Sequence, residues 1–240
     1  MSALVEVSGL RKSYDDKVVL DDVSLTVQHH DVICLIGSSG SGKSTLLRCL
    51  NLLEEIDDGV ITFEGREISD PRVDPREVRS RIGMVFQAYN LFPHLTVLEN
   101  CTLAPRRVHG VPKAEAEAHA RDLLGRFGLA DQVDKHPDRM SGGQQQRAAL
   151  VRAMCTSPTL LLLDEITAAL DPELVGEVLE IVRSEAEAGT TMILATHEMD
   201  FARDVATTVC FLDQGRILEQ GPPAQIFSSP REERTRQFLR

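Results

Sequence analysis

The sequence predicts an α/β fold: a mainly parallel sheet core, an antiparallel β layer near the N-terminus and an inserted helical subdomain. Three observations support this prediction. Apolar and polar residues alternate near the N-terminus, several short runs farther along are apolar throughout, and a helix-rich stretch interrupts those runs. Alternation is typical of half-buried strands, whereas short continuous apolar runs are typical of parallel strands that are covered on both faces.

The alternating segments predict the antiparallel layer. Val5 and Val7 lie two residues apart, and Val23, Leu25 and Val27 repeat this spacing. Successive side chains of a strand point to opposite faces, so each of these segments buries one face only. We therefore expect them to form an edge layer of antiparallel strands.

Five short apolar runs predict the parallel core. The first begins at Val32 and is ended by Gly37. Runs of this length, bounded by glycine or polar residues, favour strands that are buried on both faces of a sheet. The five runs are residues 32–36, 82–86, 160–163, 191–195 and 209–212.

Between the second and third runs the sequence predicts helices. Residues 114–127 are rich in strong helix formers and are followed by Gly128, and residues 144–156 end before Pro158. Because these helices interrupt the alternation of strands and helices, we expect them to pack as an insertion against a single sheet domain. The predicted boundaries are one domain over 1–240, with its core at 1–87 and 158–240 and the helical subdomain at about 88–157.

Composition narrows the class of protein. The chain has 240 residues, of which 42 % are apolar and 26 % are charged, with a net charge of −11. This charge argues against a general nucleic-acid binder, which needs a basic face. The five cysteines are scattered, no apolar run is long enough to span a bilayer, and no basic segment precedes an apolar one at the start. We therefore expect a soluble, intracellular chain.

A glycine-rich loop follows the first parallel strand and predicts a phosphate site. Its glycines let backbone N–H groups turn inward, and the following helix adds the positive end of its dipole. Lys43 is expected to reach the β- and γ-phosphates of a nucleotide, and the Ser44 hydroxyl to take a Mg²⁺ position. The alternative is a flexible turn before a helix. The loop consists of Gly37, Ser38, Ser39, Gly40, Ser41, Gly42, Lys43 and Ser44.

Polar residues also follow three other predicted strands. Asp164 ends the leucine run, where a carboxylate suits Mg²⁺, and Glu165 is then expected to face the water that attacks the γ-phosphate. Gln87 follows the strand predicted at 82–86 and is expected to bind Mg²⁺ or water. His197 follows the strand predicted at 191–195 and is expected to contact the γ-phosphate. The carboxyl ends of parallel strands are where α/β sheets bind ligands. The alternatives are a helix cap for Asp164 and Glu165 and structural roles for Gln87 and His197.

Two further features bear on a nucleotide. Tyr14, in a turn between the early strands, has a ring that suits stacking on adenine or, alternatively, packing of the edge layer. A second glycine-rich segment opens the later helix and offers free N–H groups to an anion, although the same segment also reads as a simple capped helix start. This segment is Ser141, Gly142, Gly143 and Gln144.

Together these motifs resemble the nucleotide-binding domain of ATP-binding-cassette (ABC) proteins, which implies the P-loop NTPase ABC-cassette fold, ATP and Mg²⁺. The resemblance implies that residues 37–45, including Thr45, are the Walker A motif, and that residues 160–164 are Walker B. It implies a Q-loop at Gln87, a signature at residues 140–144 that contacts the ATP of the other subunit, and a D-loop at Asp171. In the same pattern Glu165 is the catalytic glutamate, His197 the switch histidine and Tyr14 the adenine-stacking residue.

Several stretches are similar to the ATPase subunits of polar amino acid importers. They are residues 86–100, 102–105, 196–199 and 233–239. The resemblance implies a head-to-tail homodimer that holds ATP between its copies, bound to integral-membrane permease subunits at the cytoplasmic face of the cell membrane. It also implies an extracytoplasmic solute-binding protein as an indirect partner.

Three residues depart from the family pattern. Met140, Ile166 and Ala168 replace the usual leucine, proline and serine. The last two replacements bear on the rate of ATP hydrolysis and on the coupling between the two ATP sites.

Two other classes of protein compete with an importer subunit. A cassette ATPase acting on nucleic acid or ribosomes normally has two cassettes, a coiled-coil insertion or basic tails, and the sequence shows none of these. A small-molecule kinase on a P-loop fold gives no reason for the signature segment.

Overall fold

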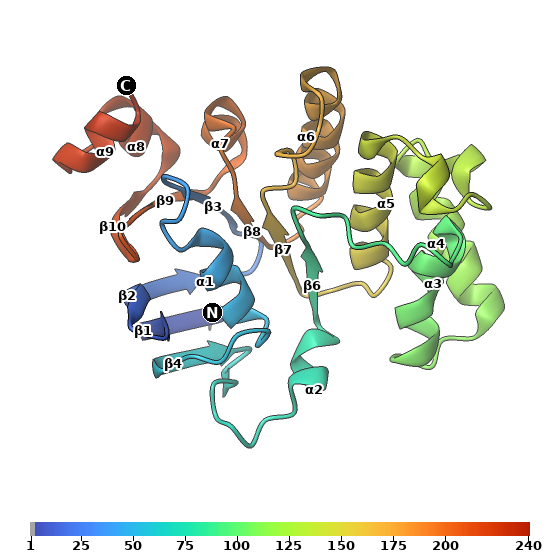
Figure 1. Cartoon of the computed structure of the whole chain (residues 1–240), viewed down its shortest axis with the longest axis horizontal. Coiled ribbons are helices and arrows are strands. Elements are labelled where there is room, and N and C mark those ends of the chain that lie inside the picture. Colours follow the sequence, from blue (N-terminus) through green and yellow to red (C-terminus); the bar gives the residue numbers. More distant parts are fainter. Residues whose placement is uncertain (1–2) are drawn as a thin grey trace.

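Two sheets organise the chain, which a computed structural model describes over residues 3–240 (Figure 1). The first sheet is antiparallel, with the strand order β2-β1-β4-β5. Val5 pairs with Val27 and Val7 with Leu25, which confirms the predicted edge layer. The two shorter strands of this sheet were not predicted from the sequence. Its strands are β1 (Val5–Tyr14), β2 (Lys17–Val27), β4 (Asp58–Phe63) and β5 (Arg66–Glu67).

The second sheet has the order β10-β9-β3-β8-β7-β6, and its five predicted strands run parallel. This confirms the mainly parallel core. Only β10, which the sequence reading did not predict, is antiparallel to its neighbour β9. Its strands are β3 (Val32–Ile36), β6 (Ile82–Val85), β7 (Leu160–Asp164), β8 (Met192–Ala195), β9 (Thr208–Asp213) and β10 (Arg216–Gly221).

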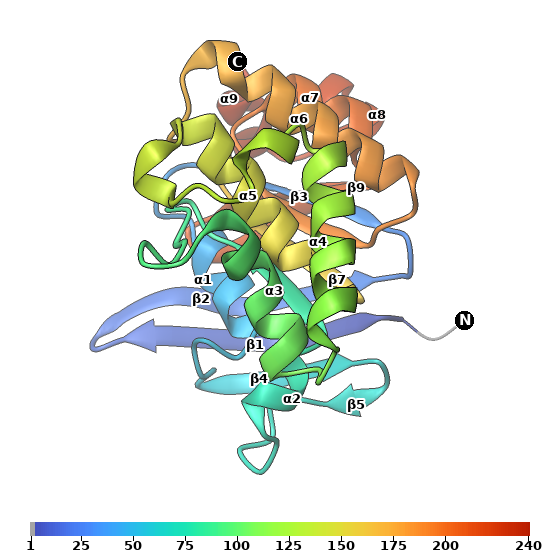
Figure 2. The ribbon, with the colours of Figure 1, turned by 90° about the vertical axis from the view of Figure 1, so that its right-hand side faces the viewer.

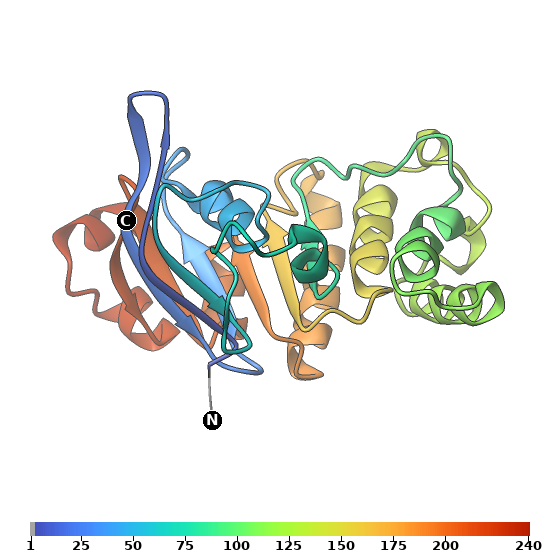
Figure 3. The same ribbon diagram turned by 90° about the horizontal axis from the view of Figure 1, so that it is seen from below.

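The helices lie on both sides of this sheet and at one end of the molecule. Between β6 and β7 stand α3 (Val97–Arg107), α4 (Lys113–Arg126) and α5 (Gly142–Met154). Figure 3 shows these three helices grouped at the end opposite to β10 and the C-terminal helices, and Figure 2 is viewed from the end that they form. The others are α1 (Lys43–Leu50), α2 (Pro75–Arg79), α6 (Pro172–Glu187), α7 (Met199–Val205), α8 (Pro223–Ser228) and α9 (Glu233–Phe238).

The predicted helix at 114–127 is confirmed with one-residue shifts, and the helix predicted at 144–156 begins earlier, at Gly142. The earlier start has a local cause. Ser141 takes the N-cap position, so the two glycines that follow it form the first turn of α5. Within residues 3–240, no helix has both the length and the apolar character needed to cross a membrane.

The six-stranded sheet separates two hydrophobic cores. Ile33 and Leu35 of β3 belong to the core that is shared with α1 and the antiparallel sheet. Cys34 and Ile36 point to the opposite core, which is shared with α5 and α6. Burying a large apolar side chain contributes roughly 1.5–3 kcal/mol, so both faces of β3 hold the strand in place. The loops at the carboxyl ends of these strands therefore start from fixed positions.

Candidate nucleotide-binding site

The glycine-rich loop joins β3 to α1, and its shape requires glycine at two positions. Gly37 has φ +150°, and a Cβ atom there would lie 2.1 Å from the Leu212 carbonyl oxygen. Gly42 has φ +109°, and its Cβ would lie 2.7 Å from the Leu20 side chain. Both values fall where side chains are disfavoured. The backbone therefore curls at the start of α1, where N–H groups and the helix dipole meet.

Lys43 is folded into this loop. Its side chain is only 3 % exposed, and Nζ donates hydrogen bonds to the carbonyl oxygens of Gly37 at 3.0 Å and Ser38 at 3.2 Å. Nζ also lies 3.4 Å from Oε1 of Glu165. The cation is thus held at the loop by the carbonyl groups and by a carboxylate from the end of β7.

Ser44 and Asp164 form the second contact between α1 and β7. Ser44 Oγ donates to Asp164 Oδ1 at 2.7 Å, and Asp164 is 2 % exposed. Burial raises the pKa of the Asp164 carboxyl, while the Ser44 hydrogen bond and the charges of Arg48 and Lys43 act in the lowering direction. Two hard oxygen ligands therefore stand together beside the phosphate loop.

Glu165 connects the end of β7 to the end of β8. Its Oε1 lies 3.1 Å from His197 Nε2, and its backbone N–H donates to the Ala195 carbonyl at 2.9 Å. Its φ is +46°, an unusual value for a residue with a side chain. The next helix, α6, begins only at Pro172. The alternative in which Asp164 and Glu165 cap that helix is therefore wrong.

Gln87 lies at the same sheet edge but on a different strand end. Val85, the last residue of β6, pairs with Leu163 of β7, and Asp164 is the next residue of β7. Gln87 comes two residues after Val85, so it lies near the end of β7 that carries Asp164. Its side chain is exposed. The structure therefore brings the ends of β3, β6, β7 and β8 to one edge, as the sequence predicts.

Tyr14 lies outside that cluster, beside α1. It is the last residue of β1, and not a turn residue as expected from the sequence, because it still pairs with Lys17 of β2. Tyr14 is 40 % exposed. Burial, and after it the nearby Glu54 carboxylate, raises the pKa of the phenol, while the Thr45 hydroxyl acts in the lowering direction. The ring thus stands next to the first turn of the phosphate-loop helix.

The second glycine-rich segment is a capped helix start that does not meet the phosphate loop. Ser141 Oγ accepts from the Gln144 N–H at 3.3 Å, and Gln144 Oε1 accepts from the Ser141 N–H at 3.1 Å. This is a capping box. Figures 1 and 3 show α5 displaced from α1, with β6 and β7 between them. Asp171 takes the N-cap position of α6, with no side-chain capping bond.

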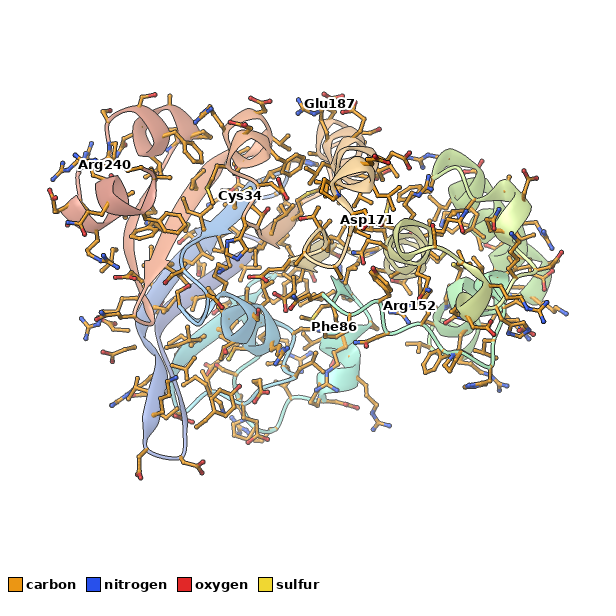
Figure 4. The ribbon with its side chains drawn as sticks, turned by 45° about the horizontal axis from the view of Figure 1, so that its top comes forward. Cys34, Phe86, Arg152, Asp171, Glu187 and Arg240 are labelled. Carbon is orange, nitrogen blue, oxygen red and sulfur yellow. The ribbon has the colours of Figure 1, made fainter. Side chains whose placement is uncertain are left out.

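Tyr89 was not predicted from the sequence to have a role in the site. Its hydroxyl donates to the Ala169 carbonyl at 3.2 Å, and a Cβ on Gly142 would lie 3.0 Å from the same hydroxyl. Arg152, labelled in Figure 4, donates through Nη2 to the Tyr89 carbonyl at 3.1 Å. Three segments therefore meet at one phenol: the loop after β6, the loop before α6 and the start of α5. One indication of a role for Tyr89 was present in the sequence, which is that the chain has only two tyrosines.

The three departures from the family pattern lie in different surroundings. Met140 and Ile166 are both buried in the core that contains α5. Ala168 is exposed, and its N–H donates to the Glu165 carbonyl at 3.0 Å. Apolar side chains suit the first two positions because both are enclosed by apolar neighbours.

A glycine-rich loop after β3, a buried carboxylate at the end of β7 and a glutamate directly after it are the arrangement of a P-loop nucleoside-triphosphatase. The family model for ABC transporters matches residues 20–168. Relatives extend this over nearly the whole chain. The general L-amino acid transport ATP-binding protein AapP of Rhizobium johnstonii is 50 % identical, covering 98 % of this chain and 91 % of its own. The chain belongs to the ABC transporter family.

Other relatives and solved structures agree with this assignment. The L-cystine transport system ATP-binding protein TcyN of Escherichia coli is 50 % identical over 100 % of this chain and 98 % of its own. The glutamine transport ATP-binding protein GlnQ of Geobacillus stearothermophilus is 48 % identical over 96 % and 95 %. The ATP-binding cassette MJ0796, solved as a dimer in a post-hydrolysis state bound to ADP and Pi, is 28 % identical with a TM-score of 0.82, covering 91 % of this chain and 98 % of its own.

Proposed function

We propose that this chain is the ATP-hydrolysing subunit of an ABC importer for polar amino acids, bound to a permease at the cytoplasmic face of the membrane. The observation that carries the proposal is the cluster of Lys43, Ser44, Asp164, Glu165 and His197 at one sheet edge, with contacts of 2.7–3.4 Å between them. The named relatives supply the solute class, because they transport glutamine, cystine and general L-amino acids.

The residues of the cluster divide the work of phosphoryl transfer. The phosphate loop and Lys43 bind the phosphate chain, and the buried Ser41 hydroxyl, which has no partner among residues 3–240, is a further donor within the loop. Glu165 orients and deprotonates the attacking water, and His197 fixes the Glu165 carboxylate and contacts the γ-phosphate. The Lys43 ammonium also contacts the Glu165 carboxylate. When Lys43 moves onto the phosphates of ATP, the Glu165 carboxylate becomes free to contact the water.

The oxygen ligands present fit Mg²⁺. Ser44 Oγ and Asp164 Oδ1 lie 2.7 Å apart at the end of β7, and Gln87 reaches the same edge from β6. A hydroxyl, a carboxylate and an amide oxygen are hard donors of the kind that Mg²⁺ takes in nucleotide sites, alongside phosphate and water. We propose that Ser44, Gln87 and Asp164 hold the ion, which when bound neutralises charge on the phosphates.

The signature segment is proposed to serve a second copy of the chain. Within one chain, Ser141 to Gln144 lie on α5, displaced from the phosphate loop on α1. A head-to-tail homodimer would place this helix start, with its N–H groups, against the ATP bound by its partner. The dimeric form of the MJ0796 cassette supports this arrangement.

The remaining partners follow from the importer class. Integral-membrane permease subunits would contact the loop after Gln87, and an extracytoplasmic solute-binding protein would deliver the solute to them. The net charge of −11 continues to argue against nucleic acid as a partner.

Uptake measurements test the proposal. Cells of the source organism that lack the chain would be complemented with the wild type or with Lys43→Ala, and the uptake of labelled amino acids would be followed. We expect the wild type to restore, and Lys43→Ala to fail to restore, uptake of at least one polar amino acid. Unchanged uptake of the whole panel in all three strains would refute the assignment of solute class, whereas ATP hydrolysis by the purified chain tests the enzymatic part separately.

A further inference from the structure

Lys12 lies over the ring of Tyr14 at the end of β1. Its Nζ is 5.1 Å from the ring centroid, within the range of a cation–π contact. The Lys12 side chain is only 12 % exposed, whereas Tyr14 is 40 % exposed. An enclosed ammonium group therefore lies over the ring of a residue that is itself largely open to solvent.

Two carboxylates hold the Lys12 ammonium over the ring. Nζ lies 3.9 Å from Asp57 Oδ1 and 4.0 Å from Glu54 Oε2. Asp57 is itself fixed to β1, because its Oδ2 accepts from the Ser13 N–H at 2.6 Å and its own N–H donates to the Arg11 carbonyl at 2.8 Å. The ammonium is thus fixed by a segment that returns from α1 to β1.

The same phenol lies close to the start of α1. Glu54 and the Thr45 hydroxyl both affect the pKa of Tyr14, and Thr45 follows Ser44 in the first turn of that helix. With the Lys12 ammonium over the ring, the exposed part of Tyr14 is the part that a flat ligand beside the phosphate loop would contact.

We propose that Lys12 is a positioning residue of the nucleotide site: it holds the Tyr14 ring so that the exposed part receives the purine base. The inference rests on the proposed function, because it requires a nucleotide whose phosphates lie in the Gly37–Ser44 loop. Without the ammonium, the ring loses its support on one face, and Glu54 and Asp57 are left beside it without their shared counter-charge. Lys12 acts on the base and not on the phosphates.

Two other roles for Lys12 make different predictions. A cation that merely attracts phosphate would favour every phosphate ligand, with or without a base. A lysine that only stabilises the β1–α1 contact would change the unfolding temperature and leave ligand discrimination unchanged. A ligand that lacks the base therefore separates the three roles.

The test compares ADP with inorganic pyrophosphate, because ADP carries the base and neither ligand requires hydrolysis. Calorimetric titration of the full chain should show that Lys12→Met raises the Kd for ADP about two- to five-fold, the range expected for the loss of one cation–π contact. The Kd for pyrophosphate should not change. Lys12→Arg should restore ADP binding, because a guanidinium also stacks on aromatic faces.

Lys17→Met is the matched control. Lys17 pairs with Tyr14 across the β1–β2 hairpin and is exposed, so its replacement removes the same charge from the same hairpin. We expect no change for either ligand. If Lys12→Met does not fold, Lys12→Gln, which keeps a polar end, takes its place in the same titrations.

A double-mutant cycle with Tyr14→Ala completes the test. Lys12→Met should have little further effect on ADP binding once the ring is gone, because the lysine acts through the ring. Three outcomes would each overturn the inference alone. Lys12→Met could weaken the binding of ADP and of pyrophosphate equally, it could leave ADP binding unchanged, or it could weaken ADP binding as much in the Tyr14→Ala background as in the wild type. If the wild type bound neither ADP nor pyrophosphate, the proposed function itself would be overturned.

Discussion

At the scale of single residues, Glu165 adopts a backbone conformation that its side chain disfavours. A left-handed backbone costs a residue with a side chain about 1–2 kcal/mol, and glycine or asparagine would adopt it more readily. Its carboxylate is nevertheless placed between Lys43 and His197, 3.4 Å and 3.1 Å away. Its side-chain contacts hold a carboxylate at the phosphate loop, where the proposed mechanism needs a base.

Glu165 and Lys43 should fail in different ways when replaced. Glu165→Gln keeps the shape of the side chain but removes the base, so turnover should fall by about 10²–10⁴-fold while ATP remains bound. Lys43→Ala removes a phosphate contact and should weaken ATP binding as well as turnover. Phosphate release and equilibrium ATP binding on the purified chain would measure both quantities. Near-normal turnover in Glu165→Gln would show that another group acts as the base.

Asp164 should make stability depend on pH. Burial raises the pKa of its carboxyl, so the fold favours the protonated form. That contribution is present below the unfolded-state pKa and is lost as pH rises through the folded-state pKa. At neutral pH, Asp164→Asn should therefore melt at a higher temperature than the wild type when nucleotide and divalent metal are absent.

The advantage of Asp164→Asn should shrink as the pH falls into the range where carboxyl groups titrate, because the wild-type carboxyl is then also neutral. Thermal unfolding across that range provides the measurement. Asp171→Asn, which replaces an exposed carboxylate at the start of α6, is the matched control. A lower melting temperature for Asp164→Asn at neutral pH would mean that attraction to Lys43 and Arg48 outweighs burial.

At the scale of secondary-structure elements, the start of α5 is fixed by contacts that are far apart in sequence. The Tyr89 hydroxyl reaches both the Ala169 carbonyl and the space beside Gly142. Glycine at this position leaves room for the phenol, and a methyl group there would crowd it. The loop after β6, which carries Gln87, is therefore packed directly on the helix that carries Ser141.

This contact predicts that Gly142→Ala and Tyr89→Phe will compensate each other. Tyr89→Phe alone should cost about 0.5–1.5 kcal/mol through loss of the bond to Ala169. In that background Gly142→Ala should stabilise the chain by about 0.4–1 kcal/mol, since alanine restricts the unfolded chain and no hydroxyl opposes it. In the wild type the gain should be smaller or reversed. Denaturant unfolding of the four proteins would measure the coupling, and strict additivity would contradict the contact.

The elements themselves were largely predictable, whereas contacts between them were not. The five parallel strands are visible in the sequence because both of their faces are buried, which leaves continuous apolar runs such as 32–36. Strands β4, β5 and β10 lie in antiparallel pairs, where polar residues interrupt the pattern. The spacing of Lys12 and Tyr14 places both on one face of β1, but the carboxylates of Glu54 and Asp57 that hold the ammonium come from another segment. The contact of Tyr89 with Gly142 likewise depends on tertiary packing.

At the scale of the whole molecule, one chain holds two proposed anion-binding elements that do not meet. The phosphate loop with Asp164 lies at α1, and the Ser141 helix start lies on α5. An isologous two-fold arrangement satisfies both elements at once, since each copy supplies one half of each site. Each copy carries a net charge of −11, so repulsion opposes association at low ionic strength and is screened by salt. Any test of association therefore belongs at moderate or higher salt.

ATP should assemble this dimer, and sedimentation of the Glu165→Gln chain with and without ATP would show it. Slow hydrolysis in this variant keeps the nucleotide bound, so the chain should sediment as a dimer with ATP and as a monomer after ATP is removed. Adding Ser141→Arg places a bulky side chain at the start of α5 and should abolish the dimer while leaving ATP binding to the monomer largely intact. Ser228→Arg is the matched control, because this exposed serine ends α8 at the other end of the molecule, and it should leave the dimer unchanged. A monomer under every condition, at concentrations well above the Kd for ATP, would mean that the permease holds the two copies together or that α5 does not contact a second nucleotide.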